Sequence, residues 1–155
     1  MAILWGASLI AVALAAGAIA TSLAPPAPLQ GAARHIATLR ALPDFGWPQF
    51  LGEAQPDALG FEEFYGLRPV AASGMPATES TDACMVLIPA AQILPDSSSF
   101  QGRMFTGCAA GPFPATIQII VRGELPPQLL ERFPDGTALQ FVLDGSRIHV
   151  YDAAE

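Results

Sequence analysis

The sequence predicts an N-terminal transmembrane helix followed by a small, mainly β domain of the α+β class, built as an antiparallel sheet or small sandwich of about five to six strands with one short helix. Residues 1–33 carry no charged side chain. Short apolar runs separated by Gly, Pro and Asp fill the second half of the chain, and this pattern is typical of strands joined by turns. We divide the chain into an anchor, a Pro-rich spacer with a short helix, an aromatic-rich strap and a β-rich domain, over residues 1–24, 25–44, 45–66 and 67–155.

The uncharged stretch over residues 2–23 is long enough to cross a lipid bilayer, since about 20 apolar residues at 1.5 Å per residue span the hydrocarbon layer. We therefore expect a single membrane anchor. A cleaved signal peptide is an alternative, because Ala18-Ile19-Ala20 has the A-x-A pattern of a cleavage site. A buried core helix is the third interpretation of this segment.

The composition limits the possible partners. Fourteen acidic residues against seven basic ones give a net charge of -7, which argues against nucleic acid because phosphate binding needs clustered cations. The chain is 52% hydrophobic and 14% charged, too apolar for a disordered protein. It contains neither Lys nor Asn, a usage that we attribute to a GC-rich genome.

Two segments separate the anchor from the β-rich domain. Pro25, Pro26 and Pro28 predict a stiff spacer, and the pattern over 32–42 predicts a short helix after it. The apolar residues of 45–66 show neither helical nor strand periodicity, which predicts irregular chain. Their bulky side chains either cover one end of the core or form a surface for a partner, since aromatic residues dominate interface anchors. These aromatics are Phe45, Trp47, Phe50, Phe61, Phe64 and Tyr65.

The β-rich domain contains six expected strands and one helix. Residues 124–133 form the helix, with prolines in its first turn and Leu129, Leu130 and Phe133 along one stripe. The strands are expected over 67–72, 84–89, 102–108, 116–122, 138–143 and 147–151.

The last two strands flank Asp144-Gly145, which predicts a two-residue hairpin turn. That turn places apolar side chains on one face and polar ones on the other, and a shift by one residue would mix the faces. The expected pairs are Phe141 with Ile148, Leu139 with Val150, Gln140 with His149, and Val142 with Arg147.

The two cysteines, Cys84 and Cys108, stand at the outer ends of another expected hairpin. If the hairpin is centred on Asp96, they lie directly opposite each other, within reach of a disulfide. The same centring pairs Val86 with Thr106 and Ile88 with Met104. Two free thiols in a reducing compartment are the alternative.

Disulfides persist outside the cytoplasm, so the preferred bond favours an extracytoplasmic domain. Arg34 and Arg40 after the anchor favour the opposite orientation by the positive-inside rule.

The sequence shows no catalytic set, cofactor motif or metal-ligand spacing. His35 and His149 are isolated, and no G-x-S-x-G, G-x-G-x-x-G or P-loop pattern occurs. We therefore expect neither catalytic residues nor a cofactor nor a bound metal, and no enzyme activity.

Three blocks are similar to small single-pass membrane proteins of actinobacteria with a two-cysteine β-rich extracytoplasmic domain. The blocks are CMVLI at 84–88, FTGCAAGPFPAT at 105–116 and FPDGTALQFVLDG at 133–145, preceded by an entry formed by Phe61, Phe64, Gly66 and Leu67. The resemblance covers residues 43–151. It implies the same layout and carries no assigned activity.

These observations predict a non-enzymatic accessory or interaction module that is anchored in the cell membrane. Its expected partners are the lipid bilayer and another membrane or envelope protein. The alternative is an envelope small-ligand binder or hydrolase, with a pocket between the aromatic strap and the sheet.

Overall fold

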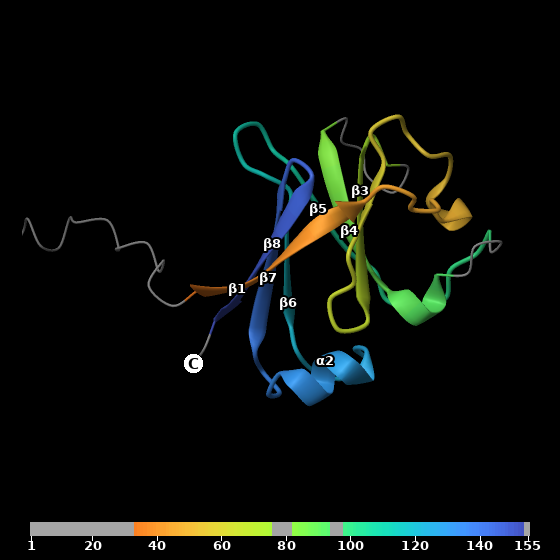
Figure 1. Cartoon of the computed structure of the whole chain (residues 1–155). Coiled ribbons are helices and arrows are strands. Elements are labelled where there is room, and N and C mark those ends of the chain that lie inside the picture. The colour runs from red at the N-terminus through yellow and green to blue at the C-terminus, as the bar shows by residue number, and fades with distance from the viewer. Residues whose placement is uncertain (1–32, 76–81, 94–97, 154–155) are drawn as a thin grey trace, which may run out of the picture. The chain divides into compact units, whose positions relative to one another are not determined.

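Eight antiparallel strands form one sheet in the order β5-β4-β3-β2-β1-β8-β7-β6 (Figure 1). The computed structural model describes residues 33–75, 82–93 and 98–153. Within them, one α-helix, α2 (Pro127–Arg132), and two 3-10 turns, η1 (Gln49–Leu51) and η2 (Ala90–Gln92), connect strands. The strands are β1 (Ala33–Leu42), β2 (Leu59–Phe61), β3 (Leu67–Ser73), β4 (Ala83–Pro89), β5 (Phe105–Cys108), β6 (Thr116–Ile120), β7 (Ala138–Asp144) and β8 (Arg147–Ala153).

The sheet curls until its two end strands, β5 and β6, lie next to each other, so it is nearly closed and barrel-like. No ladder of backbone hydrogen bonds joins β5 to β6 in the described ranges. The interior is filled by side chains from all parts of the sheet, among them Phe61, Phe141 and Ile148, which are fully buried. Leu129 and Phe133, in and just after α2, close one end of this core.

The predicted fold class is therefore wrong in its sheet. The sheet has eight strands rather than five or six, because β1 and β2 were not expected as strands. No helix in the described ranges is long and apolar enough to cross a membrane. The predicted anchor over 1–24 lies outside the described residues, as does most of the spacer.

The helix expected over 32–42 is a strand, and a β-bulge explains the misassignment. β1 pairs with β8 from Ala33 to Arg40, and the register shifts between His35 and Ala37. The extra residue brings both Ile36 and Leu39 to the core, three positions apart. A spacing of three is typical of a helix, whereas an unbroken strand would show a spacing of two.

The hairpin of β7 and β8 has the expected faces but a different turn. Phe141 pairs with Val150 and Leu143 with Ile148, so Gly145 and Ser146 are the central turn residues. Gly145 has φ +55, as the first position of a type II′ turn requires. Moving the turn by one residue changes each partner by two, and this leaves every side chain on its expected face.

The cysteine hairpin confirms the predicted disulfide. Cys84 and Cys108 are bonded, with their Cα atoms 4.0 Å apart, and Val86 pairs with Thr106 as expected. Met104 precedes β5, so the expected pair with Ile88 is not part of the ladder.

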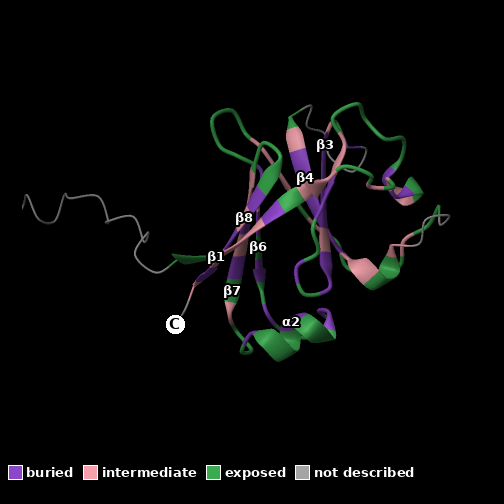
Figure 2. Ribbon diagram, in the orientation of Figure 1, coloured by how far each residue is buried: buried purple, intermediate pink, exposed green. Residues whose placement is uncertain are grey.

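Strands β3 and β4 are buried on both faces (Figure 2). One face contributes Leu67, Met85 and Leu87 to the interior of the sheet. The other face forms a second apolar cluster that includes Val70 and Val86. This double burial explains why the sequence of β4 is a continuous apolar run rather than an alternating one. The side chains of the strap that pack against the second cluster are Phe45, Trp47, Phe50 and Ala58.

Candidate functional site

The six strap aromatics do not share one exposed surface. Phe61 and Phe64 belong to the interior core, where they are 0% and 4% exposed. Phe45, Trp47 and Phe50 are half-buried over the second apolar cluster. Tyr65, at 41%, is the most exposed member of the six. Most of the strap therefore covers the outer faces of β3 and β4, and a hollow on it is lined by strap residues alone, Trp47, Gln49, Gly52, Glu53 and Ala54.

The side of β1, β8, β7 and β6 that points away from the core presents a regular grid of side chains, which we call the outer face. Cross-strand pairing aligns its residues in rows of four. Three successive rows contain no Asp, Glu, Arg or Lys. These rows are Ala33, Ala153, Ala138 and Ile120; His35, Tyr151, Gln140 and Gln118; and Thr38, His149, Val142 and Thr116.

A charged row borders the outer face at one end. Arg40 of β1, Arg147 of β8 and Asp144 of β7 lie next to one another across the strands. The change from uncharged to charged side chains therefore occurs within two residues along β1, β8 and β7, and it gives the outer face a defined border at this end.

The outer face is hollowed where its side chains are smallest. Three alanines stand in one row, and the larger Ile120, Tyr151 and Gln140 rise beside them. The resulting hollow measures about 440 Å³ and is also lined by Gln118. Ile120 is 46% exposed at its edge. The hollow has the size of a site that accepts one or two apolar side chains of a partner.

A hydrogen-bonded ladder runs across the middle of the outer face. The Thr38 hydroxyl lies 2.9 Å from Nε2 of His35 and 3.2 Å from Nδ1 of His149. The two imidazole rings are 5.6 Å apart, and the His35 ring also packs edge-on against Tyr151 at 5.4 Å. These contacts hold the polar side chains of three neighbouring positions in one arrangement.

The ladder continues to Asp144, whose carboxylate lies 3.5 Å from Nε2 of His149. An acid, an imidazole and a hydroxyl in sequence suggest nucleophilic catalysis. Here the Thr38 hydroxyl is shared with a second imidazole, and the Asp144 side chain is 76% exposed. A catalytic acid needs a held position and a catalytic hydroxyl needs a free approach, so we assign this ladder to the structure of the surface.

An ion pair between exposed Arg34 and buried Asp152 fixes the start of β1 on the inner side of the same strands. Nη2 of Arg34 donates to Oδ2 of Asp152 at 2.6 Å, and Nε donates to Oδ1 at 3.2 Å. The Asp152 side chain is 7% exposed, whereas that of Arg34 is 72% exposed. The hydrogen bonds from Arg34 hold the pKa of Asp152 below its ordinary value, against the opposing effect of burial. The carboxylate is therefore ionised and bound, and it ties β1 to β8.

The described ranges offer no metal centre. They contain no group of three or more His, Cys, Asp or Glu side chains that could hold a metal ion. No protein-family model, curated protein or solved structure matches the chain.

Sequence reasoning missed the outer face because it placed β1 in a helix. Without β1, His35 and Thr38 had no defined neighbours, and His149 was interpreted as a lone surface residue. The alternation of small or uncharged residues along β6, β7 and β8 was visible in the sequence. Only the register of four strands shows that these residues are contiguous.

Proposed function

We propose that this domain is a non-enzymatic interaction module that works outside the cytoplasm and binds a partner protein through the outer face. The observation that carries the proposal is the absence of charge over three rows of four residues, in a chain whose net charge is -7. Charged residues are depleted at the centres of protein interfaces, because burying an unpaired charge is costly. An outer face that stays in water has no such requirement.

The partner that fits this face has an uncharged contact surface with one protruding apolar side chain. The hollow supplies an apolar floor of alanine methyl groups for that side chain. Gln118, Gln140 and the hydroxyl of Tyr151 surround it with groups that can donate and accept hydrogen bonds. Asp152 also lines the hollow, but its carboxylate is bound to Arg34. Such a combination of an apolar pocket and mainly neutral polar surroundings suits a folded protein better than a charged ligand.

The disulfide is the reason why the same proposal places the domain outside the cytoplasm. Cys84 and Cys108 form a bond that persists in an oxidising environment, and this supports a position outside the cytoplasm. Attachment to a membrane rests on the uncharged stretch over 2–23, which the sequence alone supplies. The resemblance to actinobacterial membrane proteins supports the same placement.

Site-specific crosslinking tests the proposed function. A photo-crosslinking amino acid replaces Gln118, which is exposed and lines the hollow, in the full chain expressed in its native host. We expect one main adduct with another envelope protein. Ala138→Arg, which fills the hollow, abolishes this adduct, whereas the matched variant Ala91→Arg, on exposed η2, leaves it unchanged.

Two results would count against this proposal. An adduct that survives Ala138→Arg shows that the hollow does not take part in the contact. An adduct between two copies of the chain shows self-association in place of a distinct partner.

Thiol labelling tests the compartment separately. In intact cells, Cys84 and Cys108 should react with a membrane-impermeant reagent only after reduction. Labelling that requires cell lysis contradicts the placement outside the cytoplasm.

A further inference from the structure

Arg132 holds a fixed position at the end of α2, next to the exposed ring of Tyr65. Its Nε donates a hydrogen bond to the Tyr65 hydroxyl at 3.3 Å. Its guanidinium carbon lies 5.3 Å from the centre of the Phe133 ring. A guanidinium held by one nitrogen and by a ring face keeps its two terminal nitrogens together and available.

Tyr65 is held in turn by an unusual backbone and by two neighbouring rings. It is the one non-glycine residue of the described ranges with a positive φ, +47, and Gly66 follows it at φ +83. Reciprocal hydrogen bonds between Phe64 and Leu67 close this two-residue turn. The Tyr65 ring meets Phe64 and Phe133 edge-on, at 4.8 and 5.6 Å. A bulky residue adopts this backbone only where its surroundings impose it, and such positions cluster at functional sites.

Arg132 differs from the other arginines near this end of the sheet. Arg34 is paired with Asp152, and Arg68 is paired with Glu63 at 3.2 Å. No carboxylate in the described ranges lies within ion-pair distance of Arg132, whose only hydrogen bond there is the one to Tyr65. The charge of Arg132 helps to lower the pKa of Asp152 without a direct contact, so the two terminal nitrogens of Arg132 remain available to bind an anion.

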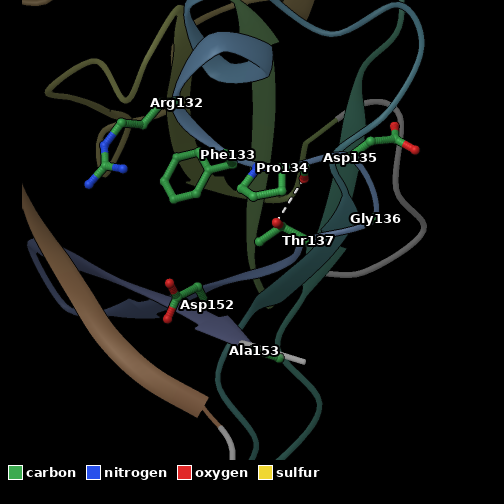
Figure 3. A pocket seen from close by; sticks show the side chains of 8 residues that line it. All are labelled: Arg132, Phe133, Pro134, Asp135, Gly136, Thr137, Asp152 and Ala153. Carbon is green, nitrogen blue, oxygen red and sulfur yellow. Dashed lines mark hydrogen bonds between the residues drawn. The ribbon is translucent and has the colours of Figure 1, made fainter.

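Two adjoining cavities meet at Arg132. The first, of about 340 Å³, has mainly apolar walls that include Ile36, Leu39 and Phe64. The second, of about 310 Å³, shares Arg132, Phe133 and Asp152 with the first. Figure 3 shows the second cavity: the rings of Phe133 and Pro134 lie side by side, Asp152 lies below them on β8, and the Arg132 guanidinium lies beyond Phe133.

The lining decides the charge of the anion. Asp152 and Glu63 also line the first cavity, where each is paired with an arginine, Arg34 or Arg68. Their carboxylates oppose any bound anion, and they oppose a doubly charged group such as a phosphate more strongly than a singly charged one. A carboxylate carries a single charge, is planar and matches two parallel N–H donors of a guanidinium. The apolar walls require an apolar body attached to it.

We propose that Arg132 binds the carboxylate of a ligand whose apolar, ring-sized body occupies the cavity between β1, the turn at Tyr65 and Phe133. Tyr65 positions the guanidinium through its hydroxyl, and Phe133 supplies the surface on which the ligand packs. A small organic acid and the C-terminus of a peptide both present this chemistry. The lining of this site and that of the hollow on the outer face have only Asp152 in common, so either proposal can fail alone.

Paired probes of equal shape test the proposal on the full chain in detergent micelles. Benzoate and benzamide have nearly the same size, and only benzoate is charged. We expect benzoate to cause saturable shifts of the backbone amide resonances of Tyr65, Arg132 and Phe133, with an affinity about tenfold above that of benzamide, as one charge-assisted contact predicts. N-acetylphenylalanine and its amide form a second pair. Tighter binding of benzoate identifies a small organic acid as the ligand, and tighter binding of N-acetylphenylalanine identifies a peptide C-terminus.

Three variants locate the site. Arg132→Gln should abolish the preference for benzoate over benzamide, and the exposed side chain makes the substitution compatible with folding. Tyr65→Phe keeps the ring and removes the hydroxyl, and it should lower the affinity for benzoate several-fold. The matched control Arg122→Gln, on an exposed arginine that lines neither cavity, should leave binding unchanged.

The proposal is overturned if benzoate and benzamide bind equally, if benzoate causes no saturable shift, or if Arg122→Gln weakens binding as much as Arg132→Gln. The last result would show non-specific attraction to surface arginines. An unchanged amide spectrum of the ligand-free Arg132→Gln variant confirms that loss of binding does not result from loss of the fold.

Discussion

Gly107 of β5 lies against the backbone carbonyl of Thr116 in β6, so closely that a Cβ atom at position 107 would overlap the oxygen. These two residues close the seam between the end strands of the sheet, which no hydrogen-bond ladder joins. Close packing at this contact therefore holds the end strands together where backbone hydrogen bonds join the other strands.

Gly107→Ala should destabilise the protein by about 1 to 3 kcal/mol, the usual cost of forcing an added methyl group into a packed site. The Thr116 oxygen belongs to the backbone and cannot rotate away, so β5 and β6 must separate. Equilibrium chemical unfolding measures the effect. Gly46→Ala is the control, because an added Cβ there meets no atom within 4 Å. Equal stabilities of the two variants would show that β5 and β6 can separate at this contact without a loss of stability.

Loss of the disulfide should lower the free energy of unfolding by about 3.5 kcal/mol, the chain-entropy value for a loop of this length. Cys84 is fully buried, so replacing it also removes packing. Reduced wild-type protein separates the two contributions, because it keeps both sulfur atoms. We expect the Cys84→Ala/Cys108→Ala variant to be less stable than the reduced protein, and the oxidised protein to be the most stable of the three. A reduced form as stable as the oxidised form contradicts this prediction.

Asp152 should make the protein lose stability in acid. Arg34 holds the pKa of this carboxyl below its value in the unfolded chain. The contribution to stability is thus fully present above the unfolded pKa and is lost as the pH falls through the folded pKa, below about pH 4. Unfolding measured as a function of pH should show a steeper fall for the wild-type protein than for Asp152→Asn.

The control for this pH dependence is Asp144→Asn. The Asp144 side chain is 76% exposed, so it should leave the acid slope unchanged. An Asp152→Asn variant with the full wild-type slope would assign the acid sensitivity to other carboxyls, such as Asp57, whose pKa is lowered by its hydrogen bonds with Ser73.

Phe61→Ala should cost about 3 to 5 kcal/mol, the range for truncating a buried phenylalanine. Phe61 is fully buried in β2, although it lies in the segment whose aromatics were candidates for a partner surface. The same substitution at Phe113, which is 71% exposed, should change stability by less than about 0.5 kcal/mol. Thermal or chemical unfolding of the two variants distinguishes core from surface. Similar losses for both would mean that Phe61 is not an anchor of the interior.

Much of the β-rich domain could be predicted because its strands carry local signals. The continuous apolar run of β4 and the alternation in β6, β7 and β8 each identify a strand without knowledge of its neighbours. The cysteines indicated their own pairing, since a disulfide requires opposed positions. The turn at Gly145 was located to within one residue, and both versions keep the apolar residues on one face.

β1 and β2 could not be predicted, because their strand character depends on partners. β1 contains a bulge that gives Ile36 and Leu39 a helical spacing, and its hydrogen bonds are made with β8, more than a hundred residues away. β2 has three residues, too few for any periodic pattern, and exists because it bridges β1 and β3. Hydrogen bonding to partner strands thus overrode the local pattern of β1 and alone decided β2, which has no pattern of its own.

The sequence by itself determined the β-rich character of this chain, its disulfide and the division of its last hairpin into two faces, because each depends on residues that are neighbours along a strand or across one turn. Only the tertiary structure decided how the surfaces are composed. The uncharged outer face requires four strands in register, and the free guanidinium of Arg132 is defined by Tyr65, which is 67 positions away in the chain. Both features arise where distant segments meet, and only the folded sheet brings those segments together.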